Sequence, residues 1–333
     1  PASEKPEVST DPLVADSVKR IVLTNRSGEI AQGLADEVVY IRVHGSILAF
    51  SAAEGKLLWR RFVGYGQDHS PVPINPEGQD GVLLSDSQML EVQRAQSDDG
   101  EILWRARIGE NFSQPVTYEG KIYLSTTSGR LLCLDADTGD ALWATTIPQT
   151  LEESPGINER PGKLYLPGDH SNLYVVDKRT GKCSESYYVG HAKGTIAVPP
   201  VALQGNDGGH VFVIENAGAD FALQVSTGRI VPNWVKHEGD SFIGSPLLIG
   251  DTLVHARVLR GTTGVRVSAV DPVTGQPVWQ TDVGVPVSML TTKPDGKGFH
   301  AVTAQAALFE LDAQSLADGA TSGPIENPGG SGA

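Results

Sequence analysis

Apolar and polar positions alternate over short stretches along most of the chain, and the same succession of stretches recurs several times. The clearest copies are Leu131–Trp143, which reads L-L-C-L-D-A-D-T-G-D-A-L-W, and Val267–Trp279, which reads V-S-A-V-D-P-V-T-G-Q-P-V-W. An apolar stretch leads into a polar turn that ends in glycine, and a tryptophan follows. Short alternating stretches predict β-strands, whereas helices need apolar spacings of three and four over about ten residues or more. The pattern therefore predicts an all-β protein.

The turn glycines give the period of the repeat. They are Gly55, Gly100, Gly139, Gly181, Gly228, Gly275 and Gly319, with successive differences of 45, 39, 42, 47, 47 and 44. Two shorter strands precede each hairpin, as in Pro115–Tyr118 and Lys121–Thr126. Strand repeats with a period in the forties are typical of propeller blades. We therefore expect a β-propeller of about seven four-stranded antiparallel blades, with eight or six as the alternatives.

The last repeat is incomplete, which bears on how the ring closes. It begins at Leu308 and lacks a strand of the tryptophan type. The N-terminal run Val18–Thr24 precedes the first full repeat, and we expect it to supply the missing strand and close the ring. Closure removes the free edges of an open array. The predicted organisation is one propeller domain at 18–319, with flexible tails or linkers at 1–17 and 320–333.

The repeated residues have structural explanations. The aspartates of the turns can accept hydrogen bonds from turn N–H groups, and the glycines can take positive φ. The tryptophans are expected to pack between neighbouring blades, the alternative being a stacking platform for a ligand. The aspartates are Asp135, Asp177 and Asp271; the glycines are Gly55, Gly100, Gly139, Gly181 and Gly275; the tryptophans are Trp59, Trp104, Trp143 and Trp279.

Net charge, hydropathy and cysteine content limit the classes of partner and the kinds of disulfide or membrane segment that we expect. The formal net charge of −14 disfavours nucleic acid and anionic lipid surfaces as partners. No apolar stretch is long enough for a membrane-spanning helix, so we expect no insertion by this chain. Two cysteines, Cys133 and Cys183, are too few for a disulfide framework, and we expect buried thiols. The chain does not begin with Met, and we expect a mature product or part of a longer protein.

The repeat L-x-x-L-D-x-x-T-G-x-x-x-W, seen best at Leu131–Trp143 and Val267–Trp279, resembles that of PQQ-like propellers over nearly the whole chain. One branch of that family comprises dehydrogenases that hold a quinone with calcium and a disulfide between adjacent cysteines. Cys133 and Cys183 are far apart, so the chain looks more like the non-catalytic branch, which includes a propeller lipoprotein of the outer-membrane β-barrel assembly machinery. That resemblance implies no cofactor, an extracytoplasmic location, and a monomeric scaffold that binds a protein partner. A PQQ- and calcium-dependent dehydrogenase is the alternative.

Candidate site residues lie just before prolines that introduce the first strand of a repeat. If these segments converge, they form a polar, largely acidic ring at one mouth of the central channel. The ring would be a solvated mouth, a cation or small-molecule site, or a quinone site, although a quinone's carboxylates would require more than the single basic candidate. The candidates are Asp68, His69, Asn111, Glu152, Glu153, His191, Lys193 and Asp240.

Catalytic patterns are otherwise missing from the sequence. Asp68, His69 and Ser70 include the residue types of a hydrolase triad, but adjacent residues of an extended segment point to opposite faces. No G-x-S-x-G, H-E-x-x-H, phosphate-binding glycine loop or C-x-x-C occurs. The sequence therefore predicts a binding or scaffold module rather than an enzyme.

Overall fold

The computed structural model describes residues 18–25, 37–51, 54–67, 69–74, 80–158, 162–168, 172–188, 199–203, 210–214, 219–226, 229–237, 242–250, 252–292, 298–303 and 308–312. These residues form strands and turns, and no helix among them could cross a membrane. The prediction of an all-β fold is confirmed.

The first four sheets each contain four strands that are consecutive in the chain. Their strands are β1 (Val18–Asn25), β2 (Glu37–Val43), β3 (Ser46–Ser51) and β4 (Leu57–Phe62); β5 (Val72–Ile74), β6 (Gly81–Asp86), β7 (Glu91–Gln96) and β8 (Ile102–Arg107); β9 (Val116–Tyr118), β10 (Lys121–Ser125), β11 (Arg130–Asp135) and β12 (Ala141–Thr146); and β13 (Gly156–Asn158), β14 (Lys163–Gly168), β15 (Asn172–Asp177) and β16 (Cys183–Tyr188).

The fifth and sixth sheets are built in the same way, and the seventh contains three strands among the described residues. Their strands are β17 (Val201–Leu203), β18 (His210–Ile214), β19 (Ala219–Ser226) and β20 (Arg229–His237); β21 (Phe242–Ile249), β22 (Thr252–Val258), β23 (Val265–Val270) and β24 (Pro277–Val283); and β25 (Val287–Thr292), β26 (Gly298–Thr303) and β27 (Leu308–Asp312).

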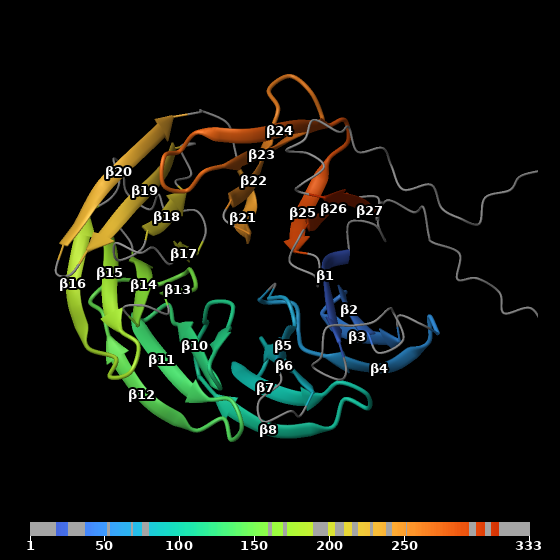
Figure 1. Ribbon diagram of the computed structural model, residues 1–333. Helices are drawn as coiled ribbons and strands as arrows, with labels where there is room; N and C mark the ends of the chain where they lie inside the picture. The colour runs from blue at the N-terminus through green and yellow to red at the C-terminus, as the bar shows by residue number, and fades with distance from the viewer. Residues whose placement is uncertain are drawn as a thin grey trace, which may run out of the picture.

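The sheets follow one another around a ring (Figure 1), and the first strand of each lies towards the centre. Within each sheet, strands that are consecutive in the chain pair antiparallel, as β10 does with β9 and β11. Strands that are close in sequence pair at a small loss of chain entropy, which explains this meander order. The prediction of a β-propeller is confirmed.

The prediction for the N-terminal strand is wrong. Strand β1 pairs with β2, from Asn25 opposite Glu37 to Val18 opposite Val43, and is the innermost strand of the first sheet. It does not supply an outer strand to the last sheet, in which β25, β26 and β27 pair in order. The short connection to β2 favours a local antiparallel pair over a pair with the other end of the chain.

The turns of the repeat have the predicted geometry. Asp135 accepts hydrogen bonds from the N–H groups of Asp137 and Thr138, at 2.9 and 3.0 Å. Asp177 and Asp271 accept equivalent bonds in their own turns. The turn glycines have φ values of 62° at Gly55, 71° at Gly100, 76° at Gly139, 70° at Gly181 and 68° at Gly275.

The hydrophobic core lies between successive sheets, where the repeat tryptophans pack. Trp104 belongs to a buried cluster with Leu83 of its own sheet and Ile122 of the next. Trp279 stacks on Phe299 of the next sheet with ring centroids 5.9 Å apart. An indole N–H group can also bridge two sheets: that of Trp59 donates to the Ser97 carbonyl at 2.8 Å. The prediction that these tryptophans pack between blades is confirmed.

Candidate functional site

The candidate residues that the structure describes lie in loops that connect the outermost strand of one sheet to the innermost strand of the next. We call residues 63–71, 108–115 and 147–155 the crossover loops. The residue before each proline is held in an extended conformation by the proline ring, which directs the chain into the next inner strand. The loops therefore follow one another at the same end of successive sheets.

A buried arginine holds the first crossover loop. Arg42, on β2, is almost fully buried and donates hydrogen bonds to three main-chain carbonyls. It bonds Gly64 at 3.1 Å, His69 at 3.3 Å, and Gln67. A charged donor that satisfies three carbonyls is stronger than a neutral one, so it fixes the path of the loop.

Side-chain amides and hydroxyls join the three crossover loops in series. Gln67 donates to the Phe112 carbonyl at 3.0 Å, and Gln114 both donates to the Ser70 carbonyl at 2.8 Å and accepts from its N–H at 2.7 Å. Ser154 then donates to the Gln114 carbonyl at 2.6 Å. Hydrogen bonds thus join the three crossover loops that connect the first four sheets.

Two of the candidates, His69 and Asn111, belong to this connected region. The imidazole of His69 lies 5.5 Å from the Phe112 ring, measured between centroids, so two successive crossover loops touch there. Asn111 accepts through its carbonyl from the Thr127 N–H at 3.1 Å, and its side chain is exposed. The contact shown for Asn111 is therefore a main-chain one.

Glu152 and Glu153 form a pair of carboxylates in the third crossover loop. Glu152 is exposed, whereas Glu153 is half-buried and its carbonyl accepts a hydrogen bond from the Ser125 hydroxyl at 2.6 Å. Burial raises the pKa of the Glu153 carboxyl to about 7, and the Glu152 carboxylate adds to that shift. This carboxyl is therefore partly protonated near neutral pH.

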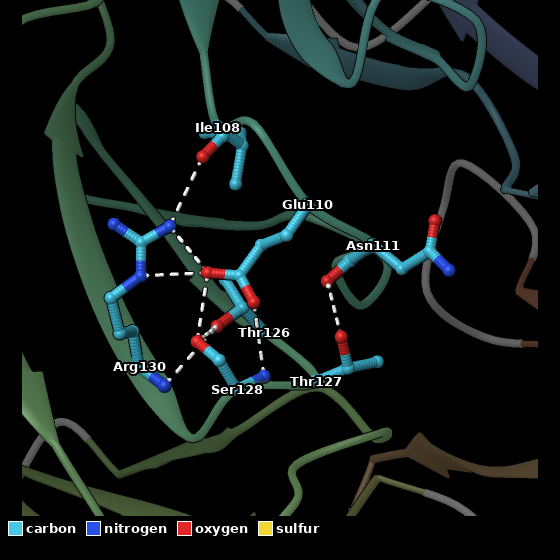
Figure 2. A network of polar contacts seen from close by, with 7 residues as sticks. All are labelled: Ile108, Glu110, Asn111, Thr126, Thr127, Ser128 and Arg130. Atoms are coloured by element: carbon cyan, nitrogen blue, oxygen red, sulfur yellow. Dashed lines mark hydrogen bonds and ion pairs between the residues drawn. The ribbon is translucent and has the colours of Figure 1, made fainter.

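A polar network fixes the second crossover loop to the turn between β10 and β11 (Figure 2). Glu110 accepts from the Arg130 Nε at 2.8 Å and from both the hydroxyl and the N–H of Ser128, at 2.8 and 3.0 Å. Burial alone would raise the pKa of Glu110, but these hydrogen bonds hold it below its ordinary value. Arg130 also donates to the Ile108 carbonyl at 3.0 Å.

The other candidates, Asp68, His191, Lys193 and Asp240, lie outside the described residues. Within the part of the chain that the structure describes, no group of three or more His, Cys, Asp or Glu side chains could hold a metal ion. The structure thus places His69 against Phe112 of the second crossover loop, and the Glu152 carboxylate acts on the neighbouring Glu153 carboxyl. Convergence of the full ring stays a prediction.

The two cysteines have the character of structural thiols. Cys133 and Cys183 are free. Burial raises the pKa of Cys133 to about 11 and also raises that of Cys183. A raised pKa keeps the nucleophilic thiolate scarce, which suits packing rather than redox chemistry. The expectation of buried thiols is met fully by Cys133 and only partly by Cys183, which is half-exposed.

Sequence reasoning missed the residues that connect the loops. Arg42 lies on a strand far from the candidate segments, and no local pattern marks it. Gln114 and Ser154 could have been found, because each directly precedes a proline, as Ser70 does. The sequence prediction left these neutral residues out, because it selected mainly carboxylate and imidazole side chains.

The ring of meander sheets, the aspartate–glycine turns and the interlocking tryptophans define a propeller of PQQ-like repeats. A family model described as outer membrane protein assembly factor BamB matches residues 43–281. That match covers well over half of the chain, and the chain belongs to this family. Because the family consists of assembly factors, the chain is in the non-catalytic branch, as the sequence predicted.

Relatives named outer membrane protein assembly factor BamB span most of this chain. The protein of Burkholderia pseudomallei is 25% identical over 80% of this chain and 70% of its own length. Those of Nitrosomonas eutropha and Shewanella oneidensis are each 23% identical, over 62% and 69% of this chain. The matched regions cover only 51% and 61% of the latter two relatives.

Solved structures support the fold. The crystal structure of BamB from Moraxella catarrhalis has a TM-score of 0.62 at 15% identity and covers 83% of this chain and 81% of its own. The computationally designed Ika8 protein also has a TM-score of 0.62, at 10% identity, and covers 89% of this chain and 83% of its own. At these identities, both likenesses concern the fold alone.

Proposed function

We propose that this chain is a protein-binding scaffold that acts in the assembly of outer-membrane proteins on the extracytoplasmic side of a bacterial envelope. The observation that carries the proposal is the family match over residues 43–281. Hydrogen-bonded crossover loops present fixed surfaces, which reduces the ordering that a partner's binding would require.

The architecture that we propose for this scaffold is a monomeric ring of seven blades within residues 18–319. Seven sheets among the described residues and the seven glycine-ended turns of the sequence support that number. The segments 1–17 and 320–333 would be tails or linkers outside the ring.

Two measurements in the native bacterium test the function. An affinity-tagged chain is expected to co-purify with the outer-membrane β-barrel assembly machinery, and removal of the gene is expected to lower the amount of β-barrel proteins in the outer membrane. A tagged Arg42→Met variant, in which we expect looser crossover loops, is compared with the wild-type chain in the same co-purification. Failure to co-purify together with unchanged outer-membrane composition would contradict the proposal.

We also propose a cation site at the crossover loops, which rests on the Glu152–Glu153 pair. A bound cation would relieve the repulsion that helps raise the pKa of Glu153. A ligand at about 100 times its dissociation constant stabilises a protein by roughly 2.7 kcal/mol. Thermal unfolding with calcium, and with calcium plus PQQ, tests this site. No change in midpoint would dispose of it, and a shift that needs PQQ would instead indicate a quinone site.

A further inference from the structure

The first and seventh sheets are the two ends of the ring (Figure 1), and they differ from the sheets between them. In the first sheet, Tyr40 and Ala49 belong to the buried cluster that is shared with the second sheet. Side chains alternate between the two faces of a strand, so Val39, Ile41 and Phe50 lie on the opposite face, towards the seventh sheet. All three are apolar and partly exposed.

The same three positions are buried in the other sheets that can be compared. Phe50 lies five residues before the turn glycine Gly55 and pairs with Val39, which fixes the equivalent places. None of the equivalent side chains is more than 3% exposed. They are Val82, Leu84 and Ala95; Ile122, Leu124 and Leu134; Leu164, Leu166 and Val176; and Leu253, His255 and Val270. The face of the first sheet is therefore an exception within the chain.

The seventh sheet shows the same exception on its own side of this wedge. His300 pairs with Glu310 and occupies the place that Tyr40, Tyr123 and Tyr165 have in their sheets. Those three tyrosines are fully buried, whereas His300 is partly exposed. Both sides of the wedge between the ends of the ring are thus less covered than the corresponding sides of the other wedges.

The place of an indole is also open in this wedge. A Cβ at Gly100 would lie 2.8 Å from the Trp59 ring, and Gly139 and Gly181 lie equally close to the tryptophans of the sheets before them. Gly55 is the equivalent glycine of the first sheet. It is exposed, and no described atom lies within 4 Å of a Cβ built there.

The strand that would carry such an indole belongs to the seventh sheet. In each of the other sheets a fourth strand pairs with the third, whereas β27 has no partner on its outer side among the described residues. Four of the fourth strands place a tryptophan at one register position, opposite Ala49, Arg94, Cys133 or Ala269. Glu310 is the equivalent on β27, because it lies two residues before Asp312 as Cys133 lies before Asp135. A strand edge of this kind offers N–H and C=O groups to another extended segment.

We propose that an extended segment of a partner protein adds to β27 as the fourth strand of the seventh sheet and places an aromatic side chain, opposite Glu310, over Gly55. The flanking segments 1–17 and 313–333 contain no Trp, Tyr or Phe that could fill this place. Main-chain hydrogen bonds to β27 would supply affinity, and the aromatic side chain would supply specificity. The inference rests on the proposed scaffold function and names the surface and the chemistry of its partner.

The test is fluorescence anisotropy of the purified full chain with labelled copies of its own fourth strand. The probe is a peptide with the sequence of residues 140–147, D-A-L-W-A-T-T-I, and its comparison replaces the Trp by Ser. We expect the Trp peptide to bind roughly tenfold more tightly, because only its side chain fills the place over Gly55.

Two N-methylated forms of the Trp peptide test the strand pairing. One carries methyl groups on the N–H groups of its third and fifth residues, the other on those of its fourth and sixth. Alternate N–H groups of an antiparallel strand point to opposite neighbours, so one form should bind as the parent does and the other should lose binding.

A substitution in the chain tests the place of the aromatic ring. Gly55→Asn keeps a residue that tolerates positive φ but puts a side chain where the ring would lie, and it should abolish the advantage of the Trp peptide. Gly120→Asn is the matched control, since Gly120 has a φ of 68° and a Cβ there would also meet no atom within 4 Å. It should leave both affinities unchanged.

Absence of binding, equal affinities of the Trp and Ser peptides, or equal affinities of the two N-methylated forms would overturn the inference. So would a Gly55→Asn chain that still prefers the Trp peptide. If one of these results is found while the wild-type chain co-purifies with the assembly machinery, the scaffold function stands and only this surface is wrong.

Discussion

A single contact repeats from sheet to sheet: the turn glycine of one sheet lies against the tryptophan of the sheet before it. A Cβ at Gly139 would lie 2.6 Å from the Trp104 ring, and one at Gly181 would lie 2.5 Å from the Trp143 ring. The glycine thus serves two needs, a positive φ and room for an indole. By contrast, a Cβ at Gly55 would meet no atom within 4 Å.

This difference predicts unequal effects of alanine. Gly139→Ala should lower the free energy of unfolding by about 3 kcal/mol, since a clash with the ring adds to the strain of a positive φ. Gly55→Ala carries the strain alone and should cost about 1 kcal/mol. Urea denaturation of the two variants measures both values. Equal losses would show that backbone strain, and not the indole contact, dominates at Gly139.

At the scale of elements, each sheet is a meander of strands, and the crossover loops determine how neighbouring sheets are joined. Local pairing places β1 inside the first sheet, against the expectation that it would complete the last. The loops are joined by hydrogen bonds between side chains and main-chain carbonyls, as Gln114 joins Ser70. Such bonds leave the position of a loop sensitive to single substitutions.

Arg42 is the sharpest case. Arg42→Met keeps much of the side-chain volume but leaves the carbonyls of Gly64, Gln67 and His69 without their charged donor, and we expect a loss of about 3 kcal/mol. Amide hydrogen exchange should accelerate across residues 63–70 more than in β11 or β15. Arg60→Met, on the exposed face of the next strand but one, is the matched control and should change neither quantity. Uniform acceleration would mean that Arg42 supports the whole ring.

At the scale of the molecule, the core is distributed in the wedges between sheets, so stability depends on every sheet contact around the ring. The cluster around Tyr123 and Leu131 continues into Leu164 and Val176 of the next sheet. No sheet buries its faces alone, and we expect unfolding to be cooperative. The half-buried carboxyl of Glu153, at one point of the ring, therefore influences the stability of the whole.

Glu153 links that stability to pH. Its pKa is about 7 in the folded chain and 4.5 ordinarily, so the folded state retains a proton that the unfolded state has released. Stability contributed by the neutral carboxyl is complete below pH 4.5 and is lost as pH rises towards about 7. Glu153→Gln should therefore stabilise the chain by about 1–2 kcal/mol at pH 8, relative to wild type, and by less at pH 5.

Denaturation of both chains at the two pH values measures that difference, and Glu152→Gln serves as the comparison, since it removes only the repulsion. A constant difference between wild type and Glu153→Gln from pH 5 to pH 8 would show that Glu153 titrates normally.

Local patterns sufficed for the repeat and for its internal contacts. The spacing of Gly100, Gly139 and Gly181 indicated the sheets, and the aspartate before each glycine indicated the turn bonds, because these features depend on residues within one hairpin. The candidate site was predicted less well. His69, Asn111, Glu152 and Glu153 were placed in the right loops, yet the loops are joined by Arg42 and by neutral residues before prolines.

By itself, the sequence determined the all-β propeller and the packing role of the tryptophans, since strand alternation, turn chemistry and a regular period act over a few residues each. Only the tertiary structure decided where β1 pairs, which carbonyls Arg42 holds, and that Gln67 and His69 contact Phe112. These facts depend on distances between segments tens of residues apart, and those distances come from the closing of the sheets around the ring.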